Sequence, residues 1–240
     1  MGGALPDWAV MSVRRYRLDV RDGITRVTDE PEVDKIVRVP YELGKPVAHL
    51  ALHLSDLEFA LEYLHRLDRI GYPDMGGMPD IVHEALWLAA LVSTYKCFGR
   101  SGARSSLEPE KIFTDAHDLK NFNVFRNLRN KNVVHDDNDT SQAHVGALLR
   151  AAGREPKVFD VAAFWSGGSW VSSGNTAALR RVIALSIGWV EDEFDRVNRL
   201  AEDELERLSY KELAALPRVI VQNPGGSIDS IGETRQTPGK

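Results

Sequence analysis

Apolar residues at helical spacing fill most of this chain and limit what it can fold into. Between residues 47 and 70 an apolar residue recurs mostly every three or four positions, at Leu50, Leu52, Leu54, Leu57, Ala60, Leu61, Leu64 and Leu67. This is the period of one face of an α-helix. The same pattern predicts helices over residues 80–98, 109–135 and 176–208. The sequence therefore predicts a mainly α protein with four long helices.

Helix boundaries are indicated by breakers and capping residues. Gly71 and Pro73 end the first helix, and the third has a break near Thr114 as an alternative to one continuous helix. A short last helix begins at Ser209, because Ser209 and Glu212 have the spacing of a capping box. The helix over residues 80–98 is apolar around most of its circumference, which predicts a central position.

Two regions show alternating patterns instead. Residues 16–20 and 24–27 flank a turn signal and predict a β-hairpin. Residues 36–39 are a possible third strand, ended by a proline. Residues 145–164 predict a second hairpin, with a short helix at 141–152 as the alternative. The predicted organisation is a β-rich or irregular lead-in at 1–47, a helical domain at 48–216 and a disordered tail at 217–240.

Composition excludes several classes of protein. The chain of 240 residues has 30 basic and 35 acidic residues, and this net charge of −5 disfavours a wholly basic nucleic-acid binder. The lone Cys97 excludes an internal disulfide framework and a cysteine-rich zinc site, and it fits a reducing cytoplasm. No run approaches the roughly 18 apolar residues of a membrane span, and no signal peptide is visible. We therefore expect a cytoplasmic protein with no membrane partner.

Basic residues gather in two stretches that lack acids. Residues 85–107 and 119–135 contain no Asp or Glu. The basic residues in these stretches are Lys96, Arg100, Arg104, Lys120, Arg126, Arg129 and Lys131. Two adjacent helix ends with this composition predict a cationic patch that attracts an anion. The predicted third helix also carries five asparagines, which are poor helix formers and suggest a polar network or ligand contacts.

Arg129 occupies an unusual place on the third helix. At about 100° per residue it lies within roughly 40° of Phe122 and Phe125, on an apolar stripe. His135 lies about 120° around the helix and about 9 Å along it. The two side chains therefore converge only if the helix unwinds at Asp136 or if a second subunit contributes its own pair. The structural alternative is that Arg129 pairs with a buried carboxylate and His135 caps the helix.

Residues 129–135, with Arg129, Asn130 and His135, resemble the Arg-polar-x(3–5)-His motif of HEPN domains. Residues 85–98 also resemble the second core helix of several HEPN-like families. The resemblance covers about residues 48–208. It implies an antiparallel four-helix bundle, usually a homodimer with both motifs at the interface, and the small β-hairpin appendages come from the alternating patterns alone.

The resemblance also implies an activity, which is metal-independent cleavage of RNA by toxins and phage-defence effectors. His135 would transfer a proton, Arg129 would stabilise the scissile phosphate and Asn130 would orient either group. Flanking phosphates would bind the basic residues Arg126, Lys131, Lys96 and Arg100. We expect no metal and no other cofactor, RNA as the partner, and an antitoxin-like neutralising protein if the chain is a toxin. The alternative is a non-catalytic nucleotide- or protein-binding module that uses the same helix.

Overall fold

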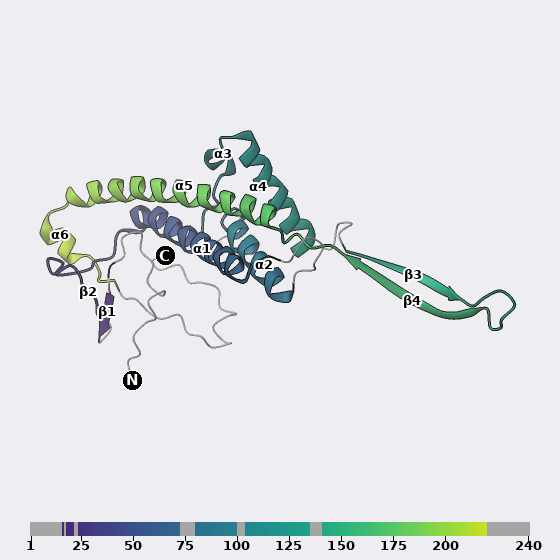
Figure 1. Cartoon of the computed structure of the whole chain (residues 1–240). Helices are drawn as coiled ribbons and strands as arrows, with labels where there is room; N and C mark the ends of the chain where they lie inside the picture. Colours follow the sequence, from purple (N-terminus) through teal and green to yellow (C-terminus); the bar gives the residue numbers. More distant parts are fainter. Residues whose placement is uncertain are drawn as a thin grey trace. The chain divides into compact units, whose positions relative to one another are not determined.

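The computed structural model describes Tyr16 and residues 18–21, 24–72, 80–99, 104–134 and 141–219. Within these residues the chain is mainly α-helical, as the sequence predicts (Figure 1). The helices are α1 (Tyr41–Ile70), α2 (Ile81–Lys96), α3 (Pro109–Ile112), α4 (Ala116–Leu128), α5 (Ser173–Glu206) and α6 (Tyr210–Ala215), and the π-helix η1 (Arg129–Val134) follows α4. The break near Thr114 is confirmed, because α3 and α4 are separate helices.

Two antiparallel hairpins accompany the helices. The strands are β1 (Leu18–Arg21), β2 (Ile24–Val27), β3 (Ser141–Leu149) and β4 (Val158–Gly167). β1 pairs with β2, and β3 pairs with β4 in a register that places Val145 opposite Ala163. Both predicted hairpins are confirmed. The alternative of a short helix at 141–152 is wrong, because alternating side chains in residues 143–149 follow the pleat of a strand.

The chain divides into two compact units. The first unit draws on residues 1–56, 100–106 and 187–240, and the second on residues 57–99 and 107–186. Each unit takes one part of α1 and one part of α5, so neither unit is a continuous stretch of sequence.

The helix caps explain where several elements begin. The Asp80 carboxylate accepts hydrogen bonds from the backbone N–H groups of Val82 and His83, at 2.9 and 3.0 Å, and so starts α2. Ser209 and Glu212 form the reciprocal capping box that their spacing predicts. These local signals are reliable because the bonds join residues only two or three positions apart.

The predicted start of the first helix is wrong. α1 begins at Tyr41 rather than Val47, with Pro46 inside the helix. The carbonyl of Pro40 accepts the backbone N–H groups of Leu43 and Gly44, at 3.1 and 2.9 Å, and so starts the first turn earlier.

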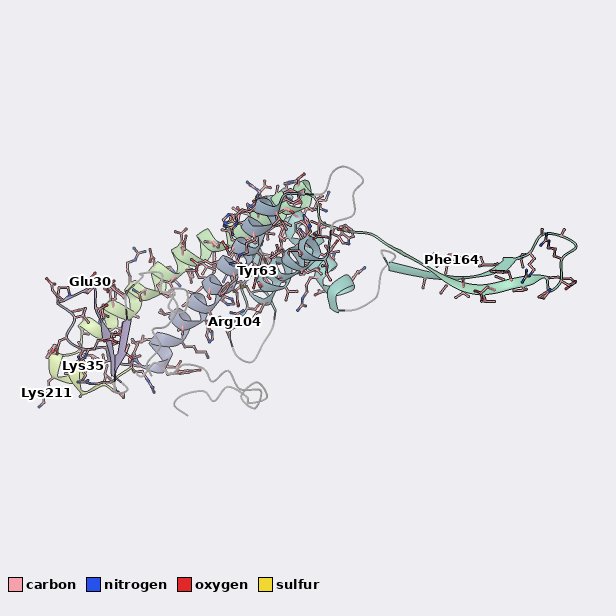
Figure 2. The ribbon with its side chains drawn as sticks, turned by 60° about the horizontal axis from the view of Figure 1, so that its bottom comes forward. Glu30, Lys35, Tyr63, Arg104, Phe164 and Lys211 are labelled. Carbon is pink, nitrogen blue, oxygen red and sulfur yellow. The ribbon has the colours of Figure 1, made fainter. Side chains whose placement is uncertain are left out.

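The predicted third strand at 36–39 is only an isolated bridge between Val37 and Arg218. The backbone N–H of Arg38 donates to the carbonyl of Pro217 at 2.6 Å. The Lys35 ammonium donates to the carbonyl of Ala214 in α6 (Figure 2). These segments lie far apart in the sequence, and both belong to the first unit.

The core of the second unit is built from four helical segments. Its buried apolar residues are Leu57, Ala60, Leu64 and Leu67 of α1, Trp87, Ala90 and Leu91 of α2, Phe122, Phe125 and Leu128 of α4, and Leu179, Val182 and Ile183 of α5. Each set recurs at three or four residues, so each helix turns one apolar stripe inward. Among the helices that the structure describes, none is long and apolar enough to cross a membrane.

Candidate functional site

The predicted motif begins where α4 changes into a π-helix. Asp115 caps α4 by accepting hydrogen bonds from the backbone N–H groups of His117 and Asp118, at 2.8 and 3.2 Å. After Leu128 the chain continues as η1, which begins at Arg129. π-Helical turns are rare and occur often at functional sites. The geometry that a regular α-helix predicts for the motif is therefore wrong from Arg129 onward.

Aromatic contacts hold α4 against α2. The Trp87 and Phe125 rings meet edge to face with centroids 6.1 Å apart, and the Tyr95 and Phe122 rings are 5.1 Å apart. The Tyr95 hydroxyl donates to the Phe122 carbonyl at 2.7 Å, and burial raises the pKa of Tyr95, which keeps this donor protonated. Contacts between α2 and η1 extend the same packing. The described part of the motif, in η1, thus packs beside a buried aromatic contact.

Arg129 is half-buried and only partly satisfied. Its Nη1 donates to the side-chain oxygen of the exposed Asn130 at 3.0 Å. Its Nε is buried and has no hydrogen-bond partner. The buried carboxylate that the structural alternative requires does not contact Arg129 among the described residues. A buried N–H without a partner costs about 1–3 kcal/mol, so this donor favours an incoming acceptor.

The contact between α2 and α4 contains a second unpaired donor. Trp87 is 1% exposed, and its Nε1 has no hydrogen-bond partner. Trp87 contacts Phe125, and Arg129 follows Phe125 by four residues, which is one helical turn. Two buried N–H groups, one on α2 and one at the start of η1, are therefore left without a partner.

The other predicted phosphate-binding residues are arranged unevenly. Arg126 is exposed, with its guanidinium 5.6 Å from the centroid of the Phe122 ring, and Lys131 is exposed on η1. Lys96 is exposed at the end of α2, nine residues and about 13 Å beyond Trp87 along that helix, so it is not gathered with Arg129. Arg100 and His135 lie outside the described residues.

The predicted cationic patch loses one member. Arg104 forms an ion pair with Asp56 of α1, and the two side chains are only 9% and 17% exposed (Figure 2). Both residues belong to the first unit, whereas Arg129 belongs to the second. A largely buried pair of opposite charges contributes little to an anion-attracting field, because the two charges nearly cancel. The prediction that Arg104 belongs to the cationic patch is therefore wrong.

Sequence reasoning missed a polar cluster of Asp68, Tyr72 and Arg180. Tyr72 donates its hydroxyl to Asp68 at 2.7 Å, and Arg180 of α5 forms an ion pair with the same carboxylate. Desolvation works against ionisation, but the hydrogen bonds from Tyr72 and Arg180 outweigh it and lower the pKa of Asp68. The two charged partners are 112 positions apart, so no local pattern could reveal the cluster.

The next residue of α5 fixes α4 in a similar way. Arg181 binds Asp118 through two parallel bonds, from Nε and from Nη2, the second at 2.7 Å. The hydrogen bond from Arg181 lowers the pKa of Asp118 below its ordinary value. Consecutive arginines of α5 therefore contact α1 and α4, and the second of them holds the helix that leads into η1.

No family model, curated protein or solved structure matches this chain. Among the described residues, no group of three or more His, Cys, Asp or Glu side chains could hold a metal ion. The candidate site is therefore defined by its own geometry, with Arg129 and Asn130 at its centre.

Proposed function

We propose that the chain is a metal-independent endoribonuclease of the HEPN type, acting on RNA as a toxin or phage-defence effector. In this proposal the four helical segments of the second unit form the HEPN-like bundle. Arg129 binds the scissile phosphate, Asn130 orients Arg129, and His135 transfers the proton. A homodimer and an antitoxin-like neutralising partner belong to the same proposal.

The observation that carries the proposal is the state of the Arg129 guanidinium. Asn130 engages Nη1, which leaves the edge formed by Nε and Nη2. Arg181 binds the carboxylate of Asp118 through the same edge, so this chain already uses that geometry for an anion. A planar fork of two N–H donors suits the oxygens of a phosphate. The buried, unpartnered Nε is then satisfied by the substrate.

The chemistry requires two proton transfers and charge stabilisation. The 2′-hydroxyl attacks the adjacent phosphorus, its proton leaves to a base, and the 5′-oxygen of the next nucleotide departs with a proton from an acid. Histidine suits these transfers, because its unperturbed pKa of about 6.5 lies near neutral pH. Arg129 stabilises the negative charge that develops on the phosphate oxygens. The exposed Arg126 and Lys131 bind the phosphates on either side.

The test is RNA cleavage in the presence of a metal chelator. We expect cleavage by the unmodified chain and a loss of at least about a hundredfold in His135→Ala, the usual contribution of general acid–base catalysis. Arg129→Lys keeps the charge but removes the fork, and it should also cut the rate strongly. His117→Ala, a histidine at the start of α4, and Arg199→Ala, an exposed arginine of α5, are the matched controls.

Two outcomes would contradict this mechanism. If His135→Ala still cleaves RNA, His135 is not the residue that transfers the proton. RNA or nucleotide binding without cleavage by the unmodified chain favours the non-catalytic module on the same helix. A binding assay run on the same four variants separates these cases, because the module requires Arg129 but no proton transfer.

A further inference from the structure

The hairpin formed by β3 and β4, with residues 150–157 between them, has an exposed apolar face. Alternation and register place one set of side chains on this face, namely Ala143, Val145, Ala147, Leu149, Val158, Val161 and Ala163. Val145, Leu149 and Val161 are 74%, 72% and 62% exposed. No described side chain of either strand is buried. The described hairpin therefore leaves a continuous apolar surface without a cover.

The opposite face of this hairpin is different in composition. It carries the polar His144 and Asp160 among Gly146, Leu148, Ala162 and Phe164 (Figure 2). The Phe164 ring lies against Gly146, so part of this face is already covered by its own aromatic side chain. Only the first face is apolar along its whole described length.

A bare two-stranded hairpin needs additional packing to be stable. An isolated hairpin is marginal in water, and three strands or a packed apolar face are usually required. Natural proteins also protect exposed strands with charges or proline. β3 has neither, because its nine residues include no Asp, Glu, Lys, Arg or Pro. The apolar face and the unprotected strand both point to a protein partner.

We propose that the partner is a second copy of this chain, whose β3–β4 hairpin packs face to face and antiparallel on the first. Small side chains at the middle of the face, from Ala147 and Ala163, allow the two faces to approach closely around Val145. Because β3 is uncharged, no like charges oppose each other across this contact. The result is a small two-layer β-sandwich that buries both apolar faces.

Charges in the sequence on either side of β3 favour an antiparallel arrangement of identical strands. Asp136, Asp137 and Asp139 precede β3, whereas Arg150, Arg154 and Lys157 follow it, with Glu155 as the one acid among them. In an antiparallel pair the start of one strand lies at the end of the other. This order of charges is therefore self-complementary, which favours a second copy over an unrelated partner.

The contact area sets the expected strength. A nine-residue strand is about 30 Å long, and two strands are about 10 Å wide, so each copy contributes roughly 300 Å² in plan. Stable interfaces bury about 800 Å² per partner, and smaller ones are weak and transient. The hairpins alone therefore give a monomer–dimer equilibrium that depends on concentration.

The first experiment measures molar mass by sedimentation velocity over a wide range of concentrations, using the full chain. We expect a concentration-dependent dimer and at least a tenfold weaker association for Val145→Lys, because dimerisation would bury an unpaired ammonium. Val124→Lys is the matched control, since Val124 is a 48% exposed valine on α4. A monomer at every concentration overturns the proposal, and so does a dimer that Val145→Lys leaves unchanged.

A second experiment does not rely on a disruptive variant. Val145→Cys in a Cys97→Ser background leaves one cysteine near the centre of the proposed contact. A short bifunctional thiol reagent should link two copies of this variant but not of Val124→Cys in the same background. Equal linking of both variants contradicts the arrangement. Neither experiment depends on RNA cleavage. A monomer at every concentration would contradict both this inference and the homodimer of the proposed function, whereas a dimer that Val145→Lys leaves unchanged overturns this inference alone.

Discussion

The contact between α2 and α4 and the β3–β4 hairpin are both rich in apolar residues, yet their surroundings are opposite. Phe122 of α4 is fully buried among aromatic rings, whereas Phe164 of β4 is 51% exposed. The periodicity of apolar residues predicts both elements, and it shows which residues share one face of an element. It does not report whether a second element covers that face. The difference teaches that the helical contact is complete within one chain and that the hairpin is not.

The largest expected effect tests this difference directly. Phe122→Ala removes a ring whose centroid lies 4.7 Å from that of Phe98 and 4.9 Å from that of Phe113. We expect a loss of about 3–5 kcal/mol in the free energy of unfolding, measured by urea denaturation. Phe164→Ala, the counterpart in the hairpin, should cost about 0.5 kcal/mol or less in a dilute monomer. Equal losses would contradict the comparison.

An intermediate effect concerns a buried histidine of α1. His53 is 1% exposed and donates through Nε2 to the Ser105 carbonyl at 2.8 Å. Burial, together with the charge of Arg104, lowers the pKa of His53 to about 4. The unfolded chain, with a pKa of about 6.5, binds this proton more readily than the folded chain. Its stability contribution is therefore complete above pH 6.5 and is lost as the pH falls toward 4.

The expected loss from this titration is up to about 3 kcal/mol, measured as the free energy of unfolding against pH. His53→Gln cannot titrate and should show a shallower decline over the same interval. His144→Gln, on the exposed strand β3, is the control and should follow the unmodified chain. An unchanged decline in His53→Gln would assign the pH dependence to other groups.

The smallest expected effect concerns an element that is stabilised locally. α6 has no buried side chain, and the Ser209 hydroxyl caps it. Ser209→Ala should cost about 1 kcal/mol of local stability. Amide hydrogen exchange should then become roughly fivefold faster in α6 and stay unchanged in α2. Faster exchange in both helices would show that the cap also supports the rest of the fold.

Local bonds explain which features could be predicted. The Asp80 cap and the Ser209–Glu212 box join residues that are neighbours in sequence, and the β3–β4 hairpin follows from alternation around a polar loop. The apolar period begins only after Pro46, whereas α1 begins at Tyr41, where the carbonyl of Pro40 accepts the first backbone hydrogen bonds. The strand expected at 36–39 became a single bridge because its partner near Arg218 is brought by the tertiary fold.

The candidate site shows the same division. The resemblance to the HEPN motif pairs Arg129 with Asn130, and the structure joins them by a hydrogen bond. No spacing predicts the π-helix that begins at Arg129 and contacts α2. The ion pair of Arg104 with Asp56 and that of Arg180 with Asp68 each join residues from distant helices.

By itself, the sequence determined the helical class, most helix boundaries, both hairpins and the location of the basic motif. Each depends on interactions within a few residues, or on one face of one element. The tertiary structure alone decided which arginines are neutralised, which N–H groups stay buried without a partner and which apolar face stays exposed. Those properties depend on contacts between residues distant in the chain, which no local pattern of side chains records.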